Sequence, residues 1–141
     1  MGLFKEAINL KINWNRMDKS YQFSFEKLEV WQLSRALVKE VYLLTSKFPD
    51  TEKFGLVSQI RRSSISVSSN LAEGSSRQTA KDQAHFSTIA YSSLIETLNH
   101  LIISEDLGYL SSENLITLKK SVSVISVKIN NLRIAQLARI K

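Results

Sequence analysis

Apolar residues recur at steps of three and four along stretches of this chain that hold almost no proline or glycine. Within residues 51–75 one helical face would carry Val57, Ile60, Ser64, Val67 and Leu71. The 141 residues include one Pro and four Gly, whereas average usage would give roughly seven and ten. Because these two residue types most often interrupt helices, the pattern predicts long amphipathic helices and an all-α fold.

Capping and turn signals divide the chain into four predicted helices. They are expected over residues 24–47, 51–75, 79–107 and 111–140. Thr79 followed by Asp82 is similar to a capping box, and Gly74 and Gly108 are expected to end helices because glycine tolerates a positive φ. Short connections between rods of about 24 to 30 residues favour antiparallel neighbours. The predicted fold is therefore an antiparallel up-down-up-down four-helix bundle.

Length and composition bound the organisation of the chain. We expect one domain, with residues 24–141 as the bundle and residues 1–23 as an N-terminal extension that is partly disordered or a short helix. Met1 and Met17 are both candidate starts. Because the chain has no Cys, disulfides and thiolate metal sites are excluded. It also lacks the run of about eighteen apolar residues that a membrane span needs, so we expect a cytoplasmic protein that is neither secreted nor membrane-spanning.

Positive charge is concentrated near the C-terminus. The net charge is +6, and no Asp or Glu follows Glu113. Basic and acidic side chains balance over residues 1–113, so the excess belongs to the last predicted helix. Basic residues in a final turn can simply complement the helix dipole, but Lys119 and Lys120 come too early for that. The basic residues after Glu113 are Lys119, Lys120, Lys128, Arg133, Arg139 and Lys141.

The last predicted helix carries two apolar faces. Its seam at steps of three and four consists of Leu115, Leu118, Val122, Ile125, Ile129 and Leu132. On a helical wheel Ile116, Val127 and Ile134 lie within about 20° of one another and more than about 100° from that seam. One bundle core cannot bury both faces. Isolated apolar surface residues are common, but this alignment favours a homo-oligomer interface made by the second face.

The second predicted helix has a polar face about 140° from its apolar seam. This polar stripe consists of Gln59, Arg62, Ser66, Asn70, Glu73 and Arg77. Three interpretations are open: an ordinary solvated face, an interaction surface for a partner, or a set of contacts that specifies an oligomer.

No residue pattern indicates catalysis, a metal or a cofactor. A di-iron bundle needs Glu-x-x-His motifs, and neither His85 nor His100 lies in one. Glu96 and His100 are one helical turn apart, which favours a surface pair over metal ligands. The chain also lacks a phosphate-binding loop and a nucleophile elbow. We therefore expect a non-enzymatic protein without cofactors.

Several motifs are similar to those of a known family. They begin near Phe25 and include Phe48-Pro49, Gly55-Leu56, Ser58-Gln59-Ile60-Arg61-Arg62, Ser69-Asn70-Leu71-Ala72-Glu73-Gly74 and Leu107-Gly108-Tyr109-Leu110. In these motifs the chain resembles the four-helix bundle proteins encoded within intervening sequences of bacterial 23S ribosomal RNA genes. The resemblance implies a small, basic and usually oligomeric helical protein, with a ring of five subunits. It also implies a relationship to the accessory protein of diversity-generating retroelements, and it defines the fold better than the biochemical role.

Charge placement and the resemblance together predict a protein that binds nucleic acid, with RNA favoured over DNA. An oligomer would repeat each basic group and multiply its phosphate contacts. The aromatic residues fit core positions better than a base-stacking platform, so recognition should follow charge and shape. The candidate contacts are Lys119, Lys120, Lys128, Arg133, Arg139 and Lys141, with Arg61, Arg62, Arg77 and Lys81 as a second group.

The alternative is a protein-interaction scaffold or an accessory subunit. Its basic face would dock an acidic partner protein such as a nucleic-acid enzyme. Protein interfaces depend on a few central anchors, so the polar stripe, and Arg62 in particular, would then matter more than total charge.

Overall fold

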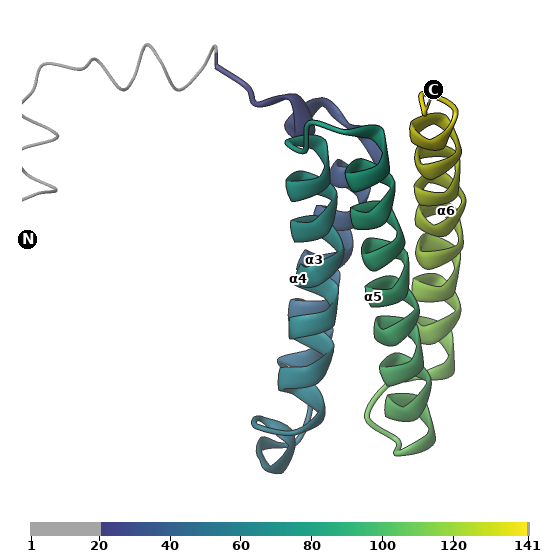
Figure 1. The fold of residues 1–141 in the computed structure, drawn as a ribbon. Helices are drawn as coiled ribbons and strands as arrows, with labels where there is room; N and C mark the ends of the chain where they lie inside the picture. Colours follow the sequence, from purple (N-terminus) through teal and green to yellow (C-terminus); the bar gives the residue numbers. More distant parts are fainter. Residues whose placement is uncertain (1–20, 141) are drawn as a thin grey trace, which may run out of the picture.

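The computed structural model describes residues 21–140 and consists of four long α-helices with two short 3₁₀ turns (Figure 1). The elements in chain order are η1 (Ser24–Lys27), α3 (Glu29–Thr45), η2 (Asp50–Glu52), α4 (Leu56–Ser75), α5 (Ala80–Asp106) and α6 (Ser112–Leu137). Residues 21–140 contain no strand. The predicted all-α four-helix bundle is confirmed. The predicted extension, residues 1–23, lies almost entirely outside the described residues, as does Lys141.

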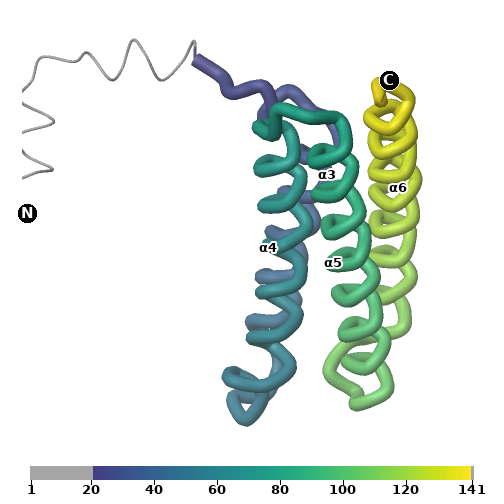
Figure 2. Tube along the Cα trace, in the orientation of Figure 1, coloured from purple at the N-terminus to yellow at the C-terminus, as the bar shows by residue number. Residues whose placement is uncertain are grey.

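Side-chain pairs show how the helices face each other. Ser63 pairs with Thr97 and Ser66 with Ser93, so residue numbers rise along α4 as they fall along α5, and the two helices are antiparallel. α4 and α5 are the most closely packed pair of helices, whereas α3 and α6 are the least closely packed neighbours. Figure 2 shows the α4–α5 connection and the C-terminal end of α6 at the same end of the bundle.

The core is a continuous apolar cluster drawn from all four helices. Leu37, Ile60, Leu94 and Ile125 are no more than 2% exposed. Every residue of the predicted α4 seam is buried, and so is the predicted α6 seam except for Leu132, which is half-buried. Burial of both seams follows from the steps of three and four, which place these residues on one side of each helix.

The first two helices begin later than the sequence predicts. Leu28 is extended, with φ −72° and ψ 120°, and separates η1 from α3. The Glu26 carboxylate holds η1 by accepting the Phe23 backbone N–H at 2.7 Å. Before α4, the Glu52 carboxylate of η2 accepts the Leu56 backbone N–H at 3.0 Å. A carboxylate that accepts a free N–H group favours the positive end of a helix dipole, so Glu52 supports a start of α4 at Leu56. Glu26 instead caps η1, and the extended Leu28 delays the start of α3 to Glu29.

Two glycines serve different purposes in the bundle. Gly108 follows α5 with φ 78°, as predicted for a helix-ending glycine. Gly74 instead lies inside α4, where a Cβ would lie 2.8 Å from the Cβ of Phe86 on α5. Its role is therefore to let the two helices approach, and the prediction that it ends α4 through a positive φ is wrong.

Candidate functional site

Basic residues of α6 lie on different sides of the helix and near both of its ends. Lys119 and Arg133 are about 21 Å apart along the axis, at about 1.5 Å per residue. Lys120 lines a cavity beside α3, whereas the Arg133 side chain contacts α5. Lys128 is paired with Glu29 of α3, with 3.2 Å between Nζ and Oε2. The predicted basic residues of α6 thus do not form one patch.

Two arginines near the end of α6 contact neutral groups of α5. Arg133 Nε donates to Thr88 Oγ1 at 3.0 Å, and Arg139 Nη2 donates to Gln83 Oε1 at 2.5 Å. Such acceptors orient a guanidinium without cancelling its charge. Within residues 21–140, no carboxylate lies within ion-pair distance of either arginine.

Arg77 and Lys81 lie at the same end of the bundle. Gln83 Nε2 donates to the backbone oxygen of Arg77 at 2.8 Å. Because Gln83 Oε1 also accepts from Arg139, the Gln83 side chain links Arg77 to Arg139. The Arg77 guanidinium lies 5.1 Å from the centroid of the Phe86 ring and 4.0 Å from a carboxylate oxygen of Asp82. Lys81 is exposed in the first turn of α5. The structure therefore brings Arg77, Lys81, Arg133 and Arg139 to one end.

Arg61 and Arg62 are engaged within the chain. Arg61 Nε donates to Thr45 Oγ1 at 3.0 Å, and its guanidinium lies over the Tyr42 ring at 4.3 Å from the centroid. Arg62 forms an ion pair with Glu96 of α5. Both arginines hold helices together, so they are less available to a ligand than Lys119 or Lys120.

The polar stripe follows the boundary between α4 and α5. Ser66 and Ser93 hydroxyl oxygens are 2.9 Å apart, and Asn70 Nδ2 donates to the backbone oxygen of Ser66 at 2.8 Å. Arg62 Nη2 donates to Gln59 Oε1 at 3.3 Å. The remaining members, Glu73 and Arg77, are exposed. Four of the six stripe residues thus make hydrogen bonds within the α4–α5 pair through their side chains.

His100 is the one buried polar group without a partner in the described chain. Its Nε2 atom forms no hydrogen bond and lies 3.5 Å from Glu96 Oε1. Nowhere in residues 21–140 do three His, Cys, Asp or Glu side chains gather as metal ligands would. None of the helices described combines the length and the apolar character needed to cross a membrane.

Three apolar side chains on the outer face of α6 are exposed. Ile116 and Val127 are each 55% exposed, and Ile134 is 64% exposed. Val124, at 49%, extends this surface toward α3. Residues 21–140 thus leave about half or more of each of these residues exposed, as an oligomer interface requires.

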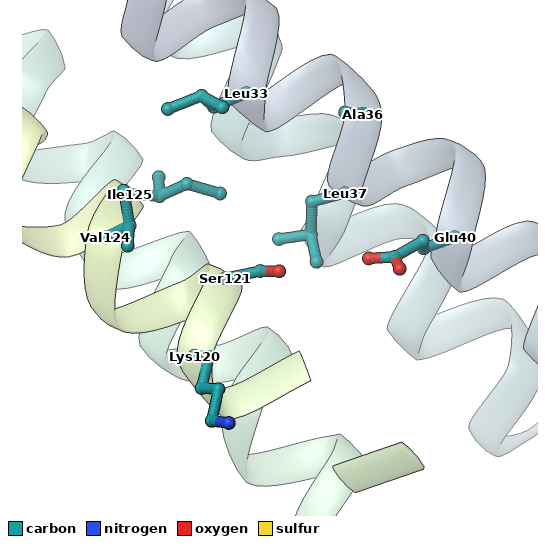
Figure 3. A pocket seen from close by; sticks show the side chains of 8 residues that line it. All are labelled: Leu33, Ala36, Leu37, Glu40, Lys120, Ser121, Val124 and Ile125. Atoms are coloured by element: carbon teal, nitrogen blue, oxygen red, sulfur yellow. The ribbon is translucent and has the colours of Figure 1, made fainter. Parts of the chain in front are cut away.

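A largely apolar cavity of about 280 Å³ opens between α3 and α6 (Figure 3). Glu40 and Lys120 approach it from opposite helices, and Leu37 and Ile125 form part of its lining. The small side chains of Ala36 and Ser121 also line it. This cavity was not predictable from the sequence, because its signal there is two small residues on helices that are distant in the chain.

A comparison with known proteins identifies the family. The model of the family described as "23S rRNA-intervening sequence protein" matches residues 26–131, which include the whole polar stripe as well as Lys119, Lys120 and Lys128. A search among curated proteins finds no match. Because the family model covers more than half of a chain that also has the expected four helices, the chain belongs to the 23S rRNA-intervening sequence protein family.

Proposed function

We propose that this protein is a non-enzymatic, oligomeric helical bundle that binds nucleic acid through charge and shape, with RNA as its preferred ligand. The observation that carries the proposal is that Lys119, Lys120, Arg133 and Arg139 have no carboxylate partner in the described part of the chain. Cations without an internal partner are free to neutralise phosphates and release counterions. The family's name, which refers to 23S rRNA, supports RNA over DNA.

Self-association is the second part of the proposal. Up-down-up-down bundles would join into a ring through Ile116, Val127 and Ile134, with five subunits as the family resemblance implies. Covering a largely exposed Val or Ile side chain contributes about 1 kcal/mol, so three per subunit support a stable contact only when repeated around a closed assembly. Such a ring, located in the cytoplasm, would present the free cations of α6 once per subunit.

A scaffold that docks an acidic protein is the alternative function. Docking through the polar stripe is the less favoured form of this function, because a partner that binds Arg62 would have to break its ion pair with Glu96. A partner that binds the cations of α6 instead would use the same groups as RNA. The two functions therefore have to be separated by experiment.

The test is fluorescence anisotropy with labelled hairpin RNA, duplex DNA and an unrelated acidic protein over a series of salt concentrations. In the test variant Lys119, Lys120, Arg133 and Arg139 are replaced by Gln. The matched control replaces four exposed lysines away from α6, which removes the same total charge: Lys27, Lys39, Lys47 and Lys53. We expect RNA affinity to fall at least about tenfold in the test variant, and the salt slope to fall by roughly 0.7 to 0.9 per lost contact, with a smaller change in the control.

Equal losses in both variants would show that only net charge matters and would refute the assignment to α6. Absence of RNA binding at low salt would refute the nucleic-acid function. If the acidic protein still bound under those conditions, the scaffold function would replace it.

Oligomerisation is tested separately by analytical ultracentrifugation. The test variant carries Ile116→Ser, Val127→Ser and Ile134→Ser, and its control carries the same change at three exposed isoleucines of α5, namely Ile95, Ile102 and Ile103. We expect the α6 variant to sediment as a folded monomer while the control stays assembled. An unchanged sedimentation coefficient in the α6 variant would place the interface elsewhere.

A further inference from the structure

A second cavity lies at the end of the bundle where α4 and α6 finish. It has a volume of about 290 Å³, opens to solvent, and is lined by residues of η1, α4, α5 and α6 together with Leu28 and Arg139. Leu28, Leu71 and Leu132 form an apolar wall, and Gln136 of α6 and Arg139, which follows α6, supply polar groups. A cavity with an apolar wall and a few convergent polar groups has the composition of a small-molecule site.

Gln136 presents unused hydrogen-bond donors to this cavity. The residue is only 5% exposed, and its Oε1 atom accepts the Ser87 hydroxyl at 2.7 Å. Its amide nitrogen donates to no residue between 21 and 140. This N–H group is free to donate, so a molecule that places an oxygen beside Gln136 Nε2 would gain a hydrogen bond there.

Arg139 supplies the charge of the cavity. One of its nitrogens donates to Gln83 Oε1, which leaves other N–H groups of the guanidinium free and holds it in place. No Asp or Glu is among the described residues that line the cavity. The lining therefore carries one positive charge and favours a ligand with one negative charge, and a carboxylate matches the planar fork of a guanidinium.

We propose that this cavity binds small monocarboxylates with an apolar body of about six to eight carbons. The carboxylate accepts hydrogen bonds from Arg139 and Gln136, and the apolar body lies against Leu28, Leu71 and Leu132. A phosphate dianion would lack a second cation. Lys119 and Lys120, two of the proposed RNA contacts, do not line the site, whereas Arg139 is shared by both proposals.

The experiment is an NMR titration of the full chain, with ¹³C-labelled leucine methyl groups, using octanoate as the probe. We expect saturable shifts at Leu28, Leu71 and Leu132 with a dissociation constant of about 0.1 to 1 mM, as fits a ligand of about ten heavy atoms. Acetate lacks the apolar body and octan-1-ol lacks the charge, so each should bind at least about tenfold more weakly. Shifts confined to Leu33 and Leu37, which report on the cavity between α3 and α6, would overturn the assignment.

Arg139→Gln tests the charge directly, because this exposed residue near the end of α6 can be replaced without disturbing the core. We expect octanoate affinity to fall about tenfold, the loss typical of a charge-assisted contact, with an unchanged circular dichroism spectrum. Arg35→Gln is the matched control, since Arg35 is exposed on α3 and does not line this cavity. Equal losses in the two variants, or equal binding of octanoate and octan-1-ol, would refute carboxylate recognition.

Discussion

Replacing Gly74 with alanine should destabilise the bundle, although alanine is the better helix former. The added Cβ would lie 2.8 Å from Phe86 Cβ and 3.6 Å from the backbone oxygen of Gln83. Carbon atoms pack best at about 3.5 to 4.0 Å. Because both Cβ atoms are fixed to their backbones, no rotamer change relieves the contact, and α4 and α5 must separate locally by about 1 Å.

The magnitude follows from two opposing terms. Alanine gains about 0.5 to 1 kcal/mol over glycine in a helix. Overpacking a close helix contact costs about 1 to 3 kcal/mol. The expected net loss is about 1 kcal/mol of unfolding free energy, which for a domain of this length lowers the midpoint of thermal unfolding by about 3 °C.

Urea denaturation followed by circular dichroism measures this difference for Gly74→Ala. Ser69→Ala is the control, because Ser69 is exposed on the same helix and gains helix propensity without a new contact. Both proteins should be compared at several concentrations, since self-association adds to apparent stability. An increase in stability for Gly74→Ala equal to that of the control would refute the close-contact explanation.

Three further predictions use the same measurement. Gly108→Ala should cost about 1 kcal/mol from backbone strain alone, because φ is 78° and a Cβ there would meet no atom within 4 Å; no loss would argue against strain. Ser63→Ala and Thr97→Val should be non-additive by at least about 0.5 kcal/mol, because their hydroxyls are bonded to each other at 2.8 Å in a buried site; additivity would show that the hydroxyls act independently. Leu37→Ala should cost about 2 to 5 kcal/mol and Leu43→Ala less than about 0.5, since these leucines of one helix are 2% and 61% exposed; similar losses would contradict the assigned core.

Local signals predicted the parts of the fold that depend on neighbouring residues. The pairing of Thr79 with Asp82 gave the start of α5, where the Thr79 hydroxyl accepts the Asp82 backbone N–H at 3.1 Å. The starts of α3 and α4 were missed because 3₁₀ turns closed by Glu26 and Glu52 use residues that are equally compatible with an α-helix.

The candidate site was predictable only in part. The sequence placed the basic residues on their helices, but the partners that engage them come from other helices. Arg61 binds Thr45 and Arg62 binds Glu96, and neither pairing has a local signal. The role of Gln83 is likewise invisible in the sequence, because it depends on the ends of α4 and α6 meeting at the start of α5.

The loose packing of α3 against α6 has a consequence for how the protein opens. α4, α5 and α6 form a continuous set of close contacts, whereas α3 is held mainly from one side. The least costly partial unfolding is then the release of α3 from an otherwise intact three-helix unit. In that state the side chains of Leu37 and Val41 enter water, and one flank of the bundle becomes accessible to another apolar helix. The backbone amides of α3 should therefore exchange with solvent more readily than those of the other three helices.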